Sequence, residues 1–164
     1  MALNLPTCLG KTHVAKLNCV FITEPAPNEG PSLWEIFEVD TRPQRKAVLA
    51  VPDHTLALEY CDDFDLFYSA QATRELERLA TGGGIVVVTH AELLVHMKEV
   101  KEGKQEALAI ANGTTYFLDE ADKMLRGRVI EDCTQLIRRL KIKGGAEAIF
   151  CFSASWTTTQ VRYL

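Results

Sequence analysis

The most informative segment of this sequence is Thr115–Asp122, which reads TYFLDEAD. Four strand-forming residues lead directly into two adjacent carboxylates, Asp119 and Glu120. Apolar residues on consecutive positions are typical of a strand covered on both faces, and ligands of parallel α/β sheets bind beyond the carboxyl ends of such strands. There, one carboxylate can hold Mg²⁺ while its neighbour orients or deprotonates a water molecule. A solvated acidic turn is the alternative interpretation.

Two further segments also place functional groups at the end of a predicted strand. Leu5–Thr12, LPTCLGKT, follows a short apolar strand and opens a helix. Its glycine, lysine and threonine are residue types that cradle phosphates and bind Mg²⁺. The strict phosphate-loop pattern requires a glycine where this chain has Leu5, so this match alone is a weak signal. Later in the chain, Ala148–Phe152 leads into the two hydroxyls of Ser153–Ser155, which reads SAS.

Predicted strands and helices alternate along the chain. The strands are expected at Ala2–Leu5, Lys46–Val51, Asp65–Ser69, Ile85–Thr89, Thr115–Leu118 and Ala148–Phe152. The helices are expected at Lys11–Phe21, Thr55–Cys61, Ala70–Ala80, Ala91–Val100 and Val129–Leu140. The last is the clearest helix, with Val129 on its apolar face together with Cys133, Leu136 and Leu140. The alternation predicts an α/β fold with a mostly parallel sheet covered by helices on both faces.

Two segments interrupt this alternation. A proline-rich stretch at about residues 23–45 is predicted to be an irregular insertion, and Glu99–Glu106 is predicted to be a charged turn around Gly103. No internal repeat is present. The chain is therefore expected to form one domain over residues 1–164.

Composition sets limits on the function. The chain has 164 residues, of which 47% are hydrophobic, enough for one domain with a substantial core. Its net charge of −4 argues against a free-standing basic nucleic-acid-binding module. Five cysteines without C-x-x-C spacing fit a reduced protein better than a disulfide framework or a zinc cluster. No apolar run approaches eighteen residues, so we expect no membrane association and an intracellular location, cytoplasmic or nuclear.

Taken in order, the three motifs resemble the first RecA-like domain of superfamily 2 helicases, most closely that of the DEAD-box and DEAD-like RNA helicases. The family's phosphate loop, A-x-T-G-x-G-K-T, is matched at Thr7, Gly10, Lys11 and Thr12. Its D-E-A-D motif is identical to Asp119–Asp122, and its S-A-T motif is similar to Ser153–Ser155. Val48–Pro52 and Ile85–Thr89 resemble the strands that lead into motifs Ia and Ib. The resemblance implies a three-layer RecA-like P-loop domain.

The resemblance implies ATP and Mg²⁺ as cofactors, with attack of water on the γ-phosphate. The ATP-binding residues would be Thr7, Cys8, Leu9, Gly10, Lys11 and Thr12. Lys11 would bind the β- and γ-phosphates, and Thr12 and Asp119 would hold Mg²⁺. Glu120 would align the hydrolytic water. Cys8 stands where the family has a glycine, and we expect this difference to weaken nucleotide binding.

The remaining roles implied by the resemblance are coupling and nucleic-acid binding. Asp122, Ser153 and Ser155 would link the nucleotide state to contacts between domains. The path of RNA or DNA would run along Pro52, Asp53, His54, Thr89 and His90. The family's arginines in motifs Ia and Ib are missing, so this chain alone is expected to bind nucleic acid weakly. The basic stretch Arg126–Lys143 either adds to this binding or is a solvated helix face.

The implied function is the ATP-binding lobe of a helicase that unwinds or remodels RNA or DNA. A second RecA-like lobe or a partner chain is expected to supply an arginine finger, without which hydrolysis is slow. Lys11, Thr12, Asp119 and Glu120 favour an enzyme. Cys8, the missing arginines and the missing second lobe favour the alternative, a degenerate module that docks protein or nucleic acid without turnover. A small P-loop NTPase outside the helicases is a third interpretation.

Overall fold

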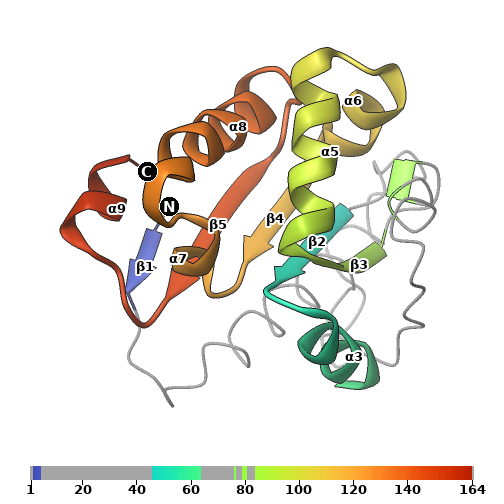
Figure 1. Ribbon diagram of the computed structural model, residues 1–164. Helices are drawn as coiled ribbons and strands as arrows, with labels where there is room; N and C mark the ends of the chain where they lie inside the picture. Colours follow the sequence, from blue (N-terminus) through green and yellow to red (C-terminus); the bar gives the residue numbers. More distant parts are fainter. Residues whose placement is uncertain (1, 5–45, 64–75, 77–78, 81–83, 164) are drawn as a thin grey trace, which may run out of the picture.

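Five parallel strands form a single sheet in the computed structural model, which describes residues 2–4, 46–63, 76, 79–80 and 84–163. The strands are β1 (Ala2–Asn4), β2 (Lys46–Val51), β3 (Gly84–Thr89), β4 (Thr114–Leu118) and β5 (Ala148–Ser153). Their order across the sheet is β1-β5-β4-β2-β3, and every pair of neighbours is parallel (Figure 1). The predicted parallel sheet is therefore confirmed.

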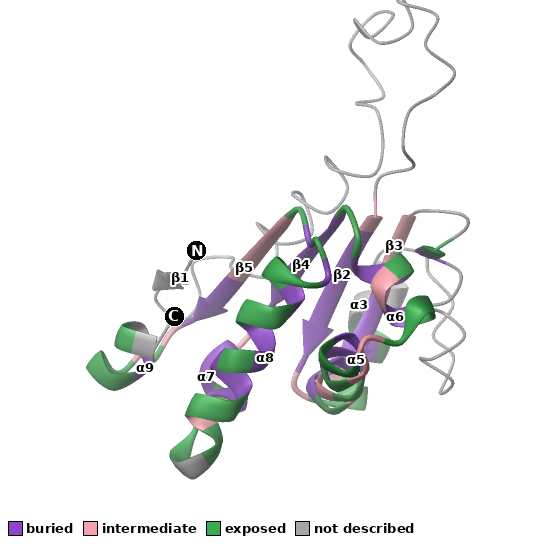
Figure 2. Ribbon diagram, turned by 90° about the horizontal axis from the view of Figure 1, so that it is seen from above, coloured by how far each residue is buried: buried purple, intermediate pink, exposed green. Residues whose placement is uncertain are grey.

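Helices cover both faces of this sheet (Figures 1 and 2). The helices are α3 (His54–Asp63), α5 (His90–Glu102), α6 (Gln105–Ala111), α7 (Ala121–Met124), α8 (Ile130–Ile142) and α9 (Thr158–Tyr163), with a short 3₁₀ helix, η1, at Gly127–Val129. Helices α5 and α8 lie against one face of the sheet (Figure 2). Helix α3 packs against the other face through a second hydrophobic cluster. This arrangement gives the predicted three layers.

The side chains of the interior strand β2, which lies between β4 and β3, divide between two hydrophobic clusters. One cluster joins β2 to α5 and α8 through Val48, Ala50, Leu93 and Leu140. The other joins β2 to α3 through Ala47, Leu49, Val51 and Ala57. Successive side chains of a strand point to opposite faces, so a strand covered on both sides needs an apolar residue at every position. This packing explains the uninterrupted apolar run of β2.

The strands predicted from the sequence agree with the observed strands in the described part of the chain. Strands expected over 46–51, 85–89, 115–118 and 148–152 are confirmed as β2, β3, β4 and β5, with bounds that agree to within one residue. The strand predicted over 65–69, the helix over 11–21 and the insertion at about 23–45 lie outside the described residues. Most of the helix predicted over 70–80 does too, although residues 76, 79 and 80 are helical.

The helix predicted from Val129 begins one residue later than expected. Val129 is 52% exposed and belongs to η1, so its assignment to the apolar face was wrong. The buried face of α8 consists of Cys133, Thr134, Leu136, Ile137 and Leu140. A 3₁₀ turn has about 3.0 residues per turn rather than 3.6, so the residues of η1 are out of phase with the helix that follows.

The charged turn predicted at Glu99–Glu106 is also wrong in extent. Helix α5 continues to Glu102 and α6 starts at Gln105, so only two residues separate them. Gly103 ends α5 in the left-handed conformation, with φ of 88°, and its N–H donates to the carbonyls of Glu99 and Val100. Charged residues continue a helix whose outer face is solvated, so the glycine determines the end of α5.

Candidate active site

The motif residues gather where the strands end. In the parallel registers, Val51 of β2 lies beside Thr89 of β3, and Leu118 of β4 lies beside Cys151 of β5. Residues that follow these strands therefore leave the sheet at one edge. Strand β1 ends at the same edge, where Asn4 lies beside Ser153. The predicted phosphate loop, Leu5–Thr12, lies outside the described residues. The roles expected of its residues therefore stay predictions.

Asp119 and Glu120 form a tight turn at the end of β4. Asp119 is 4% exposed, and its N–H donates to the carbonyl of Ala50 at 2.9 Å. The Asp119 carboxylate accepts a hydrogen bond of 3.0 Å from the N–H of Glu120. Glu120 has φ of 47° and is the only non-glycine with positive φ among the described residues; its carboxylate pairs with Lys123. A left-handed conformation costs a non-glycine residue roughly 1–3 kcal/mol and is found preferentially at functional sites.

His90 contacts this turn from the neighbouring helix α5. Its Nε2 lies 2.8 Å from the carbonyl oxygen of Asp119, and its side chain is buried. A carbonyl oxygen can only accept, so Nε2 must carry the proton. Burial lowers the pKa of His90, although the Asp119 carbonyl and carboxylate partly oppose this shift. The ring is therefore neutral at neutral pH.

Asp122 lies one turn further on, in α7, and joins β4 to β5. Its carboxylate accepts hydrogen bonds from Ser153 Oγ at 2.6 Å and from Ser155 Oγ at 3.0 Å. Arg126 pairs with the same carboxylate at 3.0 Å. Burial raises the pKa of Asp122, but the hydrogen bonds from Ser153, Arg126 and Ser155 outweigh burial and hold this pKa below its usual value. Asp122 is thus a fixed anion with three donors.

Gln160 ties α9 to α7, a role that the motifs did not indicate. Its side-chain N–H groups donate to the carbonyls of Leu125 at 2.7 Å and Asp122 at 3.1 Å. Its side-chain oxygen accepts from the N–H of Thr157 at 2.9 Å, while Thr157 Oγ1 accepts from the N–H of Gln160 at 3.2 Å. Thr157 and Gln160 form a T-x-x-Q capping box, a sequence signal that predicts the start of a helix here.

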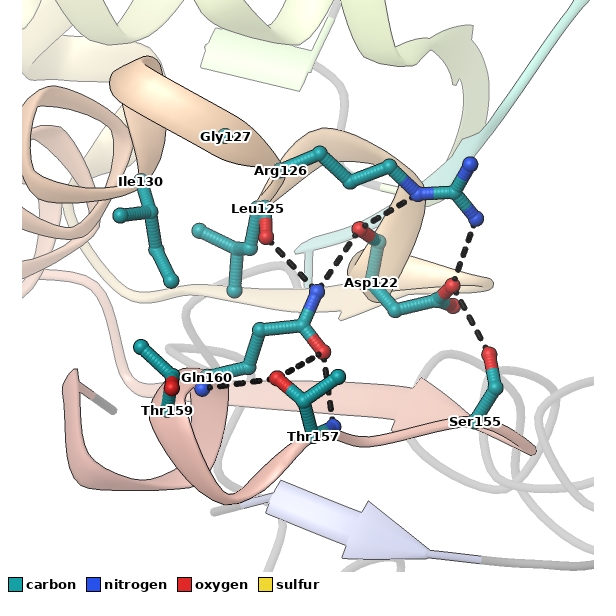
Figure 3. A pocket seen from close by; sticks show the side chains of 9 residues that line it. All are labelled: Asp122, Leu125, Arg126, Gly127, Ile130, Ser155, Thr157, Thr159 and Gln160. Carbon is teal, nitrogen blue, oxygen red and sulfur yellow. Dashed lines mark hydrogen bonds and ion pairs between the residues drawn. The ribbon is translucent and has the colours of Figure 1, made fainter.

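A hollow of about 480 Å³ opens beside this network (Figure 3). Its lining combines α7, η1, the start of α8 and α9, and consists of Asp122, Leu125, Arg126, Gly127, Ile130, Ser155, Thr157, Thr159 and Gln160. The Arg126 side chain is 63% exposed, and Ser155 is exposed as well. The carboxylate of Asp122 therefore has solvent-facing partners on one side and the buried Ser153 on the other.

The predicted nucleic-acid path divides into exposed and buried residues. Pro52 is half-buried, while Asp53 and His54 are exposed. Asp53 accepts a hydrogen bond from the N–H of Leu56 at 3.0 Å and so caps α3, which is a local reason for aspartate at this position.

Thr89 and His90, by contrast, are buried. Thr89 forms a capping box with Glu92 at the start of α5, in which the Thr89 N–H donates to the Glu92 carboxylate and the Glu92 N–H donates to Thr89 Oγ1. Both side chains are engaged within the fold. Contact of nucleic acid with any of the five residues remains a prediction.

The basic stretch Arg126–Lys143 is partly used inside the fold. Lys141 Nζ donates to the carbonyls of Ala146 and Glu147 beyond the end of α8. Lys143 Nζ donates to the carbonyl of Lys101 near the end of α5. Cations near a helix C-terminus satisfy its last carbonyls and interact favourably with the helix dipole. These two lysines therefore have structural roles at helix ends.

Comparison with known proteins identifies the family to which a chain with this fold and these motifs belongs. A model of the DEAD/DEAH box helicase family matches residues 1–163, and the chain belongs to that family. No curated protein sequence matches the chain at a significant level.

Solved structures of helicases share the fold. The DUF1998 helicase MrfA bound to DNA and AMPPNP is similar with a TM-score of 0.61 and 17% identity, over 100% of this chain and 23% of MrfA. The Hef helicase domain of Pyrococcus furiosus is similar with a TM-score of 0.58 and 16% identity, over 99% of this chain and 31% of that one. The predicted family and fold are therefore confirmed. The chain spans less than a third of the length of either helicase.

Proposed function

We propose that this chain is the ATP-binding lobe of a DEAD-like helicase, which hydrolyses Mg·ATP and in the complete enzyme couples hydrolysis to unwinding or remodelling of RNA or DNA. The observation that carries this proposal is the turn at Asp119 and Glu120, which holds two carboxylates at the carboxyl end of β4. Strand β1, which precedes the predicted phosphate loop, ends at the same edge. Family membership supports the same reaction.

Magnesium fits the carboxylate of Asp119. Mg²⁺ is usually held by one or two protein carboxylates together with substrate phosphates and water, so it does not need an all-protein cage. Among the described residues, no three His, Cys, Asp or Glu side chains gather into a metal cluster. Asp119 is buried; its carboxylate accepts from the N–H of Glu120, and its own N–H donates to the carbonyl of Ala50. Thr12 would be the second protein ligand. The ion would supply charge stabilisation for the phosphates.

Each remaining residue has a distinct task in this proposal. Lys11 would bind the β- and γ-phosphates, with the loop from Thr7 to Thr12 around them. Glu120 would exchange its pairing with Lys123 for the attacking water, which it would orient and deprotonate. Asp122 would sense the nucleotide state and transmit it through Ser153 and Ser155.

The nucleic acid and the second lobe belong to the same proposal. MrfA, whose structure was solved with DNA and AMPPNP, supports a nucleic-acid partner. The exposed Asp53 and His54, with Pro52, would line its path. A second RecA-like lobe from outside residues 1–164 would supply the arginine finger, because charge develops on the transferring phosphoryl group and an arginine placed beside it stabilises the transition state.

A second candidate function is a binding module without turnover. Asp53 and Thr89 cap helices, and His90 is hydrogen-bonded inside the fold. In the family, arginines near these positions contact nucleic acid, so the internal use of these side chains favours the binding module. Loss of those cations removes the electrostatic part of phosphate binding. Such a module would keep the fold and have no hydrolysis rate to lose.

Single-turnover ATP hydrolysis by the wild type and by Glu120→Gln, with and without RNA or DNA, tests the proposal. Loss of a general base lowers a rate by roughly a hundred-fold or more, so Glu120→Gln should be slower by that factor. Glu131→Gln removes an exposed carboxylate from α8 and is the matched control that should keep the rate. Equal rates for wild type, Glu120→Gln and Glu131→Gln would favour the binding module.

A further inference from the structure

Both polar groups of a single peptide, the one that joins Asp119 to Glu120, are fixed by hydrogen bonds. Its N–H, from Glu120, donates to the Asp119 carboxylate at 3.0 Å. Its carbonyl, from Asp119, accepts from His90 Nε2 at 2.8 Å. Rotation of this peptide would change the φ of 47° at Glu120. Held at both ends, the peptide keeps the strained turn in one orientation.

The hydrogen bond from His90 is well protected from water. His90 is 7% exposed and Asp119 is 4% exposed, so solvent cannot readily replace either partner. His90 is the first residue of α5, and the Thr89–Glu92 capping box fixes the start of that helix. The donor is therefore presented from a rigid position, whereas the acceptor belongs to the strained turn.

We propose that His90 is a positioning residue for ATP hydrolysis, because its hydrogen bond to the Asp119 carbonyl sets the orientation of the Asp119 and Glu120 carboxylates. The inference rests on the proposed function. It differs from the sequence-based expectation, in which His90 lies on the nucleic-acid path. His90 acts through the backbone of Asp119 and touches neither nucleotide nor metal in this role.

Three substitutions separate the hydrogen bond from the volume of the ring. His90→Leu and His90→Phe both remove the donor, and the phenyl ring keeps the shape of the imidazole. His90→Gln places a side-chain N–H at a similar reach and should restore the bond. Two loss variants are used because a buried substitution can prevent folding.

His96 offers a matched control on the same helix. It is buried, and its Nε2 lies 3.0 Å from the Tyr116 hydroxyl in β4, so it also bridges α5 and β4. Unlike His90, it does not contact the turn. His96→Leu should lower the free energy of unfolding as much as His90→Leu does. Comparison of the two variants therefore separates the effect of lost stability from the effect of the lost hydrogen bond to the turn.

Two measurements are made on each folded variant of the full chain. Calorimetry with a non-hydrolysable ATP analogue gives the gain in affinity on adding Mg²⁺, and single-turnover assays give the rate of hydrolysis. We expect His90→Leu and His90→Phe to lose most of the Mg²⁺-dependent gain and to slow hydrolysis by about ten-fold or more, because small misplacements of catalytic groups have effects of this size. His90→Gln and His96→Leu should keep both quantities near wild type.

The outcomes distinguish this inference from the function on which it rests. If Asp119→Asn and Glu120→Gln reduce the Mg²⁺-dependent gain or the rate but His90→Leu and His90→Phe do not, His90 has no positioning role. Equal effects of His90→Leu and His96→Leu would overturn the inference in the same way. If the wild type shows neither Mg²⁺-dependent nucleotide binding nor hydrolysis, the proposed function fails and the role of His90 fails with it.

Discussion

Ser153 Oγ donates a hydrogen bond of 2.6 Å to the carboxylate of Asp122, and both groups are buried. This bond connects α7, which follows β4, to the last residue of the neighbouring strand β5. The Ser153 oxygen also accepts from the N–H of Ser155 at 3.0 Å. Ser153 therefore fixes the carboxylate and the following turn together.

Ser153→Ala should lower the free energy of unfolding by about 2 kcal/mol, because a buried charged acceptor loses one of its donors. Urea denaturation measures this change. Ser155→Ala is the matched control: it removes a donor to the same carboxylate from an exposed position, and the loss should be about 1 kcal/mol or less. Equal losses for the two variants would contradict the distinction between a buried and an exposed donor.

Acid should destabilise the fold through His96. Burial lowers the pKa of His96 to about 4 from 6.5, so the unfolded chain binds a proton in this range that the folded chain does not. The free energy of unfolding keeps its full value above pH 6.5, where the ring is neutral in both states. It falls by about 3 kcal/mol as the pH drops from 6.5 towards 4. Urea denaturation at several pH values gives the slope. His96→Gln should flatten it between pH 6.5 and 4, and an unchanged slope would exclude His96 as the cause.

Gln160→Leu should detach α9 from α7. The substitution removes the hydrogen bonds to the carbonyls of Leu125 and Asp122 and half of the capping box with Thr157. The Asp122 carbonyl keeps its hydrogen bond from Arg126 Nε, whereas the Leu125 carbonyl loses the Gln160 donor. We expect unfolding to become easier by about 2–3 kcal/mol and the α9 amides to exchange faster with deuterium. Thr159→Ala, at an exposed position of the same helix, should change neither quantity.

Cys8→Gly should tighten nucleotide binding. Cys8 stands where the family's phosphate loop has a glycine, and in the predicted loop a side chain there would either strain the backbone or take space from the phosphates. Restoring glycine should improve affinity by about ten-fold, as measured by calorimetry with an ATP analogue. Cys8→Ala keeps a Cβ atom and should improve affinity less. An affinity of Cys8→Gly equal to or weaker than wild type would show that the cysteine is compatible with the loop.

The cluster of Asp119, Asp122 and Ser153 was predictable because it follows from topology. Carboxyl ends of parallel strands meet at one edge, so motifs that follow such strands come together whatever the intervening sequence is. Strand positions were predictable for a related reason, since uninterrupted apolar runs such as that of β2 mark burial on both faces.

Gln160 and His90 were harder to predict because their partners are distant in the sequence. The Gln160 amide reaches carbonyls 35 and 38 residues earlier, and His90 reaches a carbonyl 29 residues later. A local pattern shows that Thr157 and Gln160 cap a helix, but it does not show which main-chain groups the rest of the amide meets. Similarly, burial of Thr89 and His90 depends on how α5 packs, which the motif alone does not specify.

The pairing of β1 with β5 has a consequence for the order of folding. Strand β1 contains residues 2–4, yet its neighbour in the sheet is a strand that ends at residue 153. Strands β2, β3 and β4 are complete once residue 118 has been made, whereas β1 must wait until β5 has been made, up to residue 153, before it gains its partner. Such distant pairings form slowly. On a translating ribosome, β1 would therefore be the last of the five described strands to join the sheet.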